Sequence, residues 1–193
     1  MDYSNLKILL TGGSGFLGQA IVRELLTPDA PVKPSLIRIF DQKKPSSGLT
    51  DRRIEYFNGD IRDLNALKMA CQGIDLVIHS AAIVDWGIFS EEEVLAVNVT
   101  GTENVLEACR SRNVQHLVFT SSLDAVYSGK PLVNIGESHP YPEAHKTAYC
   151  RSKYLAEQAV IREAHGLKTV ILRPSDIYGE ADPYHIGSLI NMA

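Results

Sequence analysis

The sequence predicts an α/β domain in which one doubly wound parallel sheet lies between two layers of helices. Three observations lead to this fold class. Short apolar segments alternate with segments of helical period, a glycine-rich turn follows the first apolar segment, and hydroxyl or acidic residues follow several later ones. At 193 residues, with 45% hydrophobic and 22% charged residues, the chain is long enough to bury one core without disulfides or metals.

The predicted strands are short and rich in Ile, Leu and Val without strict alternation, which is typical of parallel strands covered on both faces. Six segments fit this description: Lys7–Thr11, Leu36–Phe40, Ile54–Phe57, Asp75–His79, His116–Thr120 and Thr169–Arg173. Ligands bind beyond the carboxyl ends of the strands in such a sheet, so a site is expected in the loops that follow them.

Helical periodicity fills the longer intervals between the strands. The first helix is expected to open near Gly15 and to stop at Pro28. The others are expected over about Leu64–Cys71, Glu91–Arg110 and Tyr149–Ala164. Strand and helix in alternation imply right-handed crossovers within one parallel sheet.

The glycine-rich turn directly follows the first predicted strand. Gly13, Gly15 and Gly18 fit the spacing G-x-G-x-x-G. Gly12, Gly15 and Gly18 fit the wider spacing G-x-x-G-x-x-G. Either way, glycine lets the backbone approach a pyrophosphate closely, and the N–H groups of the helix start favour a negative charge. The turn therefore predicts a dinucleotide site in a Rossmann-type domain. A nucleoside triphosphatase loop is excluded because no Gly-Lys-Ser or Gly-Lys-Thr follows.

Acidic residues after the next two strands suit the rest of a dinucleotide. Asp41 stands 23 residues after the last glycine of the turn, where a carboxylate accepts hydrogen bonds from the adenosine ribose. Because this carboxylate would repel a 2′-phosphate, NAD is favoured over NADP, although Lys43 and Lys44 leave NADP as the alternative. Asp60 and Ile61 are candidates to flank the adenine, with a plain helix-start aspartate as the alternative.

Tyr149 and Lys153 lie four residues apart in a predicted helix, so their side chains lie one turn from each other. Oxidation of an alcohol needs a base for the hydroxyl proton, and a free phenol with a pKa of about 10 is mostly protonated at neutral pH. An ammonium about 5 Å away, at an effective dielectric near 20, favours the phenolate by roughly 3 kcal/mol. The pair predicts Tyr149 as the general base and Lys153 as the residue that tunes it.

Hydroxyl residues end the fifth predicted strand at the same edge of the sheet. A serine there can hydrogen-bond the reacting oxygen, and we expect Ser122 rather than Ser121 to do so. Hydrolase chemistry is a poor rival because the sequence has no Gly-x-Ser-x-Gly elbow. The six histidines show no metal-binding spacing, so no metal site is expected.

Composition excludes several other classes of function. With 19 Lys and Arg against 23 Asp and Glu, the net charge is −4, and no nucleic-acid partner is expected. Three cysteines without paired spacing, no signal peptide and no apolar run long enough to span a membrane favour a cytoplasmic protein. Membrane association of a longer form is left open.

Seven segments, taken in order, resemble one family. They are Thr11–Gly18, Gly59–Asp63, His79–Ala82, Val97–Thr102, Thr120–Ser122, Tyr149–Lys153 and Arg173–Gly179. With these motifs the chain resembles an extended short-chain dehydrogenase/reductase, and it is most similar to the 3β-hydroxysteroid dehydrogenase/isomerase family. The segments cover essentially the whole chain.

The resemblance implies roles for the matching residues. The cofactor-binding residues it implies are Gly12, Gly15, Phe16, Leu17, Gly18, Asp41, Asp60, Ile61, Ala81, Ala82, Tyr149, Lys153, Pro174 and Ser175. The catalytic residues it implies are Ser122, Tyr149 and Lys153, with Asn98 supporting them. The implied reaction is the NAD-dependent oxidation of a secondary alcohol, a 3β-hydroxysteroid or sterol, to a ketone.

Residues 1–193 are expected to form a single NAD(P)-binding domain whose last residues begin a C-terminal substrate region that is largely missing. Trp86 is expected in a loop that faces a large apolar substrate, with a packing role as the alternative. Other interpretations stay open: a nucleotide-sugar epimerase or dihydroflavonol-type reductase of the same superfamily, or a non-catalytic dinucleotide-binding module. A homodimer is the assembly to test.

Overall fold

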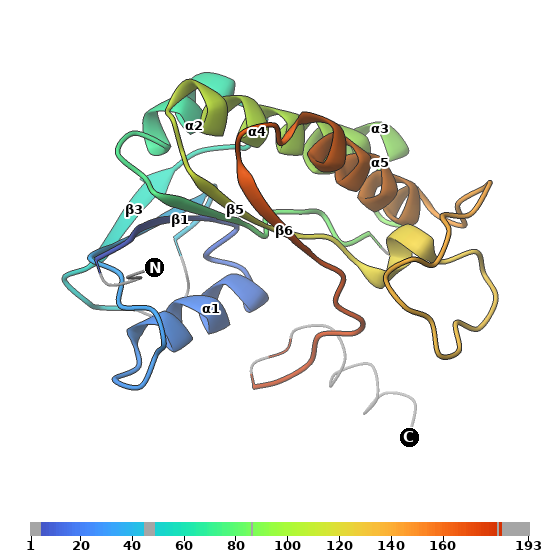
Figure 1. The fold of residues 1–193 in the computed structure, drawn as a ribbon, viewed down its shortest axis with the longest axis horizontal. Coiled ribbons are helices and arrows are strands. Elements are labelled where there is room, and N and C mark those ends of the chain that lie inside the picture. Colours follow the sequence, from blue (N-terminus) through green and yellow to red (C-terminus); the bar gives the residue numbers. More distant parts are fainter. Residues whose placement is uncertain (1–4, 45–48, 86, 181, 183–193) are drawn as a thin grey trace.

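The computed structural model describes residues 5–44, 49–85, 87–180 and 182, and its centre is a six-stranded parallel sheet (Figure 1). The strands are β1 (Lys7–Thr11), β2 (Leu36–Asp41), β3 (Ile54–Asn58), β4 (Leu76–His79), β5 (His116–Thr120) and β6 (Lys168–Leu172). Their order is β3-β2-β1-β4-β5-β6, so the chain starts in mid-sheet and builds first one edge and then the other. This order confirms the predicted doubly wound fold class.

Helices cover both faces of the sheet, as expected for a three-layer α/β fold. The helix α1 (Phe16–Leu26) lies against one face. The helices α2 (Leu64–Ala70), α3 (Glu91–Leu95), α4 (Gly101–Ser111) and α5 (Ala148–Glu163) lie on the other face (Figure 1).

The core is divided between the two faces because successive side chains of a strand point to opposite sides. Leu9 of β1 belongs to the larger cluster, which includes Val105 of α4 and Ala156 of α5. Leu10, the next residue, belongs to the smaller cluster, which includes Val22 of α1. Burial on both faces explains why the strands read as near-continuous apolar segments.

The edge strand β6 keeps part of its apolar surface exposed. Ile171 packs into the larger cluster, whereas Val170 and Leu172 on either side of it are 53% and 50% exposed. The two exposed side chains lie on the face that α1 covers farther along the sheet. That face is therefore open at β6 within the part of the chain that the structure describes.

One predicted helix differs from the structure. The segment expected as a single helix over Glu91–Arg110 is divided into α3, a π-helical turn η1 (Ala96–Thr100) and α4. A π turn adds about one residue to one helical turn, which apolar periodicity averaged over some twenty residues does not detect. The short 3₁₀ helix η2 (Leu123–Val126) was not predicted, because four residues give no periodic signal.

Several predicted ends move by one or two residues. In the structure β2 includes Asp41, β3 includes Asn58, and β6 begins and ends one residue earlier than expected. The hydrogen-bonded ladder sets these ends, whereas hydropathy marks only the buried part of a strand. Trp86 lies outside the described residues. The part of the chain that the structure describes contains no helix both long and apolar enough to span a membrane.

Candidate active site

A cleft of about 950 Å³ opens at the carboxyl ends of the strands. It is lined by most of the predicted site residues: Gly12, Gly15, Phe16, Leu17, Gly18, Asp41, Ile61, Ala81, Ala82, Ser122, Tyr149, Lys153, Pro174 and Ser175. Asp60 and Asn98 do not line it. The register explains the convergence: Thr11 at the end of β1 pairs with Phe40 on one side and His79 on the other. The loops that follow these strands therefore leave the sheet at one level.

The glycine turn brings the start of α1 against the loop that follows β4. Gly12 has a φ of +72°, and a Cβ built on it would lie 2.7 Å from the backbone of Ala81. A Cβ on Gly18 would collide with the carbonyl oxygen of Gly12. Only glycine allows both approaches. The helix begins directly after the turn, at Phe16, so its unpaired N–H groups lie at the cleft.

Asp41 ends β2 with its carboxylate held by backbone groups. Its Oδ2 accepts a hydrogen bond from the N–H of Ser14 at 3.0 Å, and its Oδ1 accepts one from the N–H of Lys43 at 3.2 Å. These bonds hold the carboxylate of Asp41 at one end of the cleft, where the glycine turn also lies. Each carboxylate oxygen keeps lone pairs that can accept further hydrogen bonds, as a ribose would require.

Tyr149 and Lys153 lie at the start of α5. Thr147 caps this helix, since its Oγ1 accepts a hydrogen bond from the N–H of Cys150 at 3.1 Å. One turn later, the Nζ of Lys153 donates to the carbonyl oxygen of Thr120 at 2.9 Å and lies 5.9 Å from the centre of the Tyr149 ring. The strand β5 therefore holds the ammonium beside the phenol.

Ser122 follows β5 and caps η2. Its Oγ accepts from the N–H of Asp124 at 3.1 Å and donates to the Oδ2 of Asp124 at 3.0 Å. The hydroxyl of Ser121 donates instead to the buried carboxylate of Glu157. Of the two serines, Ser122 is the one that acts on Tyr149, because its hydroxyl lowers the pKa of that phenol.

The pKa values of the two central groups move in opposite directions. Burial lowers the pKa of Lys153 to about 8, although the charges of Asp124 and Glu157 raise it. Burial, together with the charge of Asp124, raises the pKa of Tyr149 to about 12, although hydrogen bonding with Ser122 lowers it. Burial and the charge of Asp124 thus keep the phenol protonated near neutral pH, so the role of Tyr149 as a base stays a prediction for the site with its cofactor bound.

The family model of the 3-beta hydroxysteroid dehydrogenase/isomerase family matches residues 9–193. The chain belongs to this family. It is 38% identical over 192 residues to 3 beta-hydroxysteroid dehydrogenase type 7 of Mus musculus, covering 91% of this chain and 51% of the relative. It is 35% identical over 185 residues to the 3 beta-hydroxysteroid dehydrogenase/Delta 5-->4-isomerase of Monkeypox virus, covering 90% and 53%. The chain spans about half the length of these curated relatives.

Solved structures show the same fold. A short-chain dehydrogenase/reductase superfamily protein from Agrobacterium tumefaciens, crystallised with NAD, matches with a TM-score of 0.73 at 30% identity, covering 86% of this chain and 48% of the other. A dTDP-glucose 4,6-dehydratase from Streptomyces venezuelae, also with NAD bound, matches with a TM-score of 0.82 at 26% identity, covering 97% and 63%. The dehydratase and this chain, which belongs to the hydroxysteroid dehydrogenase family, therefore share one architecture.

Asp60, which the family resemblance implies as an adenine contact, does not line the cleft. Its carboxylate accepts from the Nε of Arg62 at 3.0 Å and from the Nε2 of Gln42 at 3.1 Å. The hydrogen bond with Arg62 lowers the pKa of Asp60. Of the predicted pair, the structure brings only Ile61 to the cleft.

Asn98 lies in the π turn and supports the site without reaching the cleft. Its Oδ1 accepts from the N–H of Ile83 at 2.8 Å, and its Nδ2 donates to the carbonyl oxygen of Ile83 and to the Oγ of Ser152, both at 2.9 Å. Ser152 in turn donates to the carbonyl oxygen of Tyr149 at 2.7 Å. The buried amide thus connects the loop after β4 with the helix that carries Tyr149.

Sequence reasoning missed Asp124, which lines the cleft beside Ser122. Its carboxylate lies close to three groups of α5: the phenol of Tyr149, the thiol of Cys150, whose Sγ is 3.8 Å from Oδ1, and the ammonium of Lys153. The available signal was its position, two residues after Ser122 beyond the carboxyl end of β5, where ligand contacts concentrate in such sheets.

Glu157 was missed as well, although it follows Lys153 by one helical turn. It is 1% exposed and accepts hydrogen bonds from Ser121, from the hydroxyl of Tyr141 at 2.5 Å and from the Nε of Arg173 at 3.1 Å. One carboxylate therefore joins the ends of β5 and β6 to the loop that precedes α5. No sequence spacing indicated that these three segments meet.

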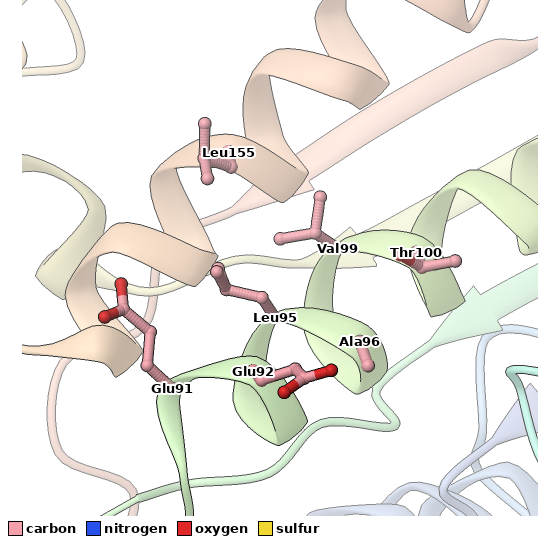
Figure 2. Close-up of a pocket in the computed structure, with 7 residues that line it drawn as sticks. All are labelled: Glu91, Glu92, Leu95, Ala96, Val99, Thr100 and Leu155. Atoms are coloured by element: carbon pink, nitrogen blue, oxygen red, sulfur yellow. The ribbon is translucent and has the colours of Figure 1, made fainter.

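A second, more open pocket of about 550 Å³ lies between α3–η1 and α5 (Figure 2). Leu155 of α5 faces Leu95 and Val99 across it. At its edge Arg151 pairs with Glu91 at 2.6 Å. It contains none of the predicted site residues, so the chemistry of the family motifs belongs to the larger cleft.

Proposed function

We propose that the protein is an NAD-dependent oxidoreductase that oxidises a secondary alcohol to a ketone, with a 3β-hydroxysteroid or sterol as its substrate class. One observation carries the proposal: Tyr149, Lys153 and Ser122 line the same cleft as the glycine turn and Asp41. A proton-transfer group at one end and a pyrophosphate cradle at the other suit hydride transfer to a dinucleotide.

The described residues fit a dinucleotide. Gly12 and Gly18 let the turn pack tightly against the loop after β4 and the start of α1, and the start of α1 offers N–H donors to a pyrophosphate. Asp41 offers carboxylate lone pairs to a ribose and disfavours a 2′-phosphate, which supports NAD over NADP. When bound, NAD supplies the acceptor for the hydride. The NAD-bound crystal structures of related folds support the same cofactor.

Each predicted residue then has a proposed role. Tyr149 exchanges the proton of the substrate hydroxyl, Ser122 orients the substrate oxygen, and Lys153 holds positive charge beside the phenol. Asn98 acts as a positioning residue through Ser152. The proposed cofactor contacts are the glycine turn with Phe16 and Leu17, Asp41, Ile61, Ala81, Ala82, Pro174 and Ser175.

Two observations support the substrate class. The curated relatives are named as 3β-hydroxysteroid dehydrogenases. Apolar side chains that include Val84, Phe89, Leu132 and Ile177 line the cleft, as a largely hydrocarbon substrate would require. Because the chain spans about half of these relatives, we propose residues 1–193 as the cofactor-binding domain. The homodimer and the cytoplasmic location stay predictions.

Replacing Tyr149 with Phe tests the chemistry. In the protein with NAD and a 3β-hydroxysteroid, Tyr149→Phe should lower kcat by about 100-fold or more, because it removes the proton-transfer group. Affinity for NAD, measured by calorimetry, should hardly change. Near-normal turnover would contradict the role of Tyr149.

The substrate class is tested separately by a panel of steroids and nucleotide sugars, followed at the absorbance band of the reduced cofactor. Turnover of nucleotide sugars alone would support the epimerase or dehydratase type of chemistry instead. NAD binding without turnover of any alcohol would support the non-catalytic module.

A further inference from the structure

The carboxylate of Glu157 is buried in the fold and has no part in the proposed chemistry. Its side chain is 1% exposed and does not line the cleft. The Nε of Arg173 donates to both of its oxygens at 3.1 Å, and the Nη2 of the same guanidinium donates to Oε1 at 2.5 Å. Burial raises the pKa of Glu157, but the hydrogen bonds from Arg173 and its other donors outweigh burial and lower the pKa. Glu157 and Arg173 therefore form a largely buried ion pair.

The segments that follow β5 and β6 are hydrogen-bonded to each other on either side of Ser122. The N–H groups of Ser121 and Leu123 donate to the carbonyl oxygens of the residues directly before and after Arg173, at 2.7 and 2.9 Å. Ser122 and Arg173 thus lie opposite each other on two joined segments of backbone. A shift of the Arg173 backbone would therefore shift Ser122 as well.

Glu157 attaches these joined segments to the helix that carries the proposed proton-transfer group. On α5 it follows Tyr149 by two helical turns and Lys153 by one. It accepts a hydrogen bond from the hydroxyl of Ser121, while the Nζ of Lys153 donates to the carbonyl oxygen of Thr120 at 2.9 Å. Two side chains of α5 therefore hold consecutive residues at the end of β5.

We infer that Glu157 is a positioning residue of the active site, which fixes the place of Ser122 relative to Tyr149 by holding Arg173 and Ser121. This inference rests on the proposed function and adds a residue to it. Proton transfer requires the reacting groups at hydrogen-bond distance, and a misplacement of about 1 Å can lower the rate by about 100-fold. Glu157 should therefore affect turnover without touching the substrate.

The carboxylate has a property that an amide of the same size lacks. Each of its oxygens accepts more than one hydrogen bond, whereas a glutamine has one accepting oxygen and an NH₂ group that would face other donors. Besides Arg173 and Ser121, the carboxylate accepts from the hydroxyl of Tyr141 at 2.5 Å, in the loop that precedes α5. Glu157→Gln should therefore weaken all three contacts and leave the charge of Arg173 unpaired.

Amide hydrogen exchange of the protein, followed by NMR, tests the inference without a substrate. In Glu157→Gln the N–H groups of Ser121 and Leu123 should exchange about 10-fold faster or more than in the wild type, because the joined segments are no longer attached to α5. The N–H of Gly12, which donates to the carbonyl oxygen of Phe40 on the other half of the sheet, should change less than about twofold. Unchanged exchange at Ser121 and Leu123 would overturn the inference.

Turnover tests the effect on chemistry, with NAD and with two probes, a 3β-hydroxysteroid and cyclohexanol, at a temperature at which each variant is folded. Glu157→Gln should lower kcat by about 10-fold or more. KM values and the calorimetric affinity for NAD should change less than about threefold, because the glycine turn and Asp41 lie on the other half of the sheet. A loss of thermal stability with unchanged kcat would mean a merely structural role and would overturn the inference.

Glu55→Gln is the matched control. It makes the same chemical change at a carboxylate that also pairs with a largely buried arginine, Arg38, at 3.0 Å, but that does not line the cleft. This variant should keep the kcat of the wild type and the exchange rates of Ser121 and Leu123.

A second variant covers the case in which an unpaired Arg173 prevents folding. Glu157→Gln combined with Arg173→Met removes both charges of the pair, so no charge is left buried alone. The double variant should fold, exchange faster at Ser121 and Leu123, and keep the low kcat. A double variant with the kcat of the wild type would overturn the inference.

The outcomes also separate this inference from the proposed function. Wild-type turnover with an unchanged kcat in Glu157→Gln overturns the positioning role and leaves the proposed function standing. A wild type that oxidises cyclohexanol but no steroid overturns only the substrate class. A wild type inactive on every alcohol overturns the proposed function, and faster exchange at Ser121 and Leu123 in Glu157→Gln would still support the attachment of Ser122 to α5.

Discussion

At the scale of single residues, the buried ammonium of Lys153 in the candidate site lowers the stability of the fold. Its ammonium is buried between the rings of Phe119 and Tyr149, and burial lowers its pKa from 10.5 to about 8. Between these two values only the unfolded chain holds the proton, so the free energy of unfolding rises with pH there. Below about pH 8 both states are charged and the burial penalty, about 3 kcal/mol, is fully present.

Lys153→Met, which lacks the buried charge, should therefore be more stable than the wild type at neutral pH. This difference in the free energy of unfolding should decrease as pH rises. Relative to the variant, the wild type should gain up to about 3 kcal/mol between about pH 8 and about pH 10.5, measured by urea unfolding. Tyr149 titrates later and in both proteins, so it cancels from the comparison. The control is Lys130→Met, at an exposed lysine, which should show no such change. A pH-independent difference for Lys153→Met would contradict the burial of a charged group.

At the scale of elements, His79 connects the sheet with a helix. Its Nδ1 lies 2.7 Å from the Oγ1 of Thr11 on β1, and its Nε2 lies 3.0 Å from the Oγ1 of Thr102 on α4. The hydroxyl of Thr102 already donates to the carbonyl oxygen of Asn98 at 2.6 Å, so Nε2 carries the ring proton and donates. Burial, with the charge of Lys153, lowers the pKa of His79 to about 3. The fold therefore holds this ring neutral.

His79→Leu should make the protein less sensitive to acid. The pKa of His79 is depressed from 6.5 to about 3, so its contribution to stability is present above pH 6.5 and is lost as pH falls toward 3. Over that range the wild type should lose up to about 1.4 kcal/mol per pH unit relative to the variant. The same substitution at the exposed His165 is the control. Parallel acid-unfolding curves for wild type and His79→Leu would be evidence against a neutral, buried ring.

At the scale of the whole molecule, the proposed cofactor site draws on both halves of the sheet. The glycine turn and Asp41 lie on one side of β1, and Tyr149 and Lys153 lie on the other. A ligand that bridges them should stabilise the folded chain as one unit. At a concentration of 100 times its Kd, NAD should raise the free energy of unfolding by about 2.7 kcal/mol.

NADP at the same concentration should stabilise less, because the carboxylate of Asp41 repels a 2′-phosphate. Asp41→Asn should narrow the difference between the two cofactors, measured by thermal unfolding with each. Equal stabilisation of the wild type by NAD and NADP would reverse the assignment of Asp41.

The fold and much of the site could be predicted from the sequence because their signals are local. Apolar segments mark strands buried on both faces, and closely spaced glycines mark a turn in which a side chain would collide with the backbone. The unpredicted features depend on contacts between distant segments. Arg62 and Gln42 hydrogen-bond the carboxylate of Asp60, and burial together with the charge of Asp124 raises the pKa of Tyr149. No residue spacing in the sequence indicates either effect.

The π turn of η1 has a consequence for how the chain tolerates change. It places one residue more than an α-helical turn would hold, and each residue of an α-helix rotates the next side chain by about 100°. Removing one residue between Glu91 and Ser111 would regularise the helix and improve its hydrogen bonding. It would also rotate Asn98 away from Ile83 and Ser152, or it would rotate the helical residues that precede Asn98 instead. In this segment a more regular helix would therefore misplace Asn98, so we expect the deletion of one residue to disturb the site more than a substitution at an exposed position would.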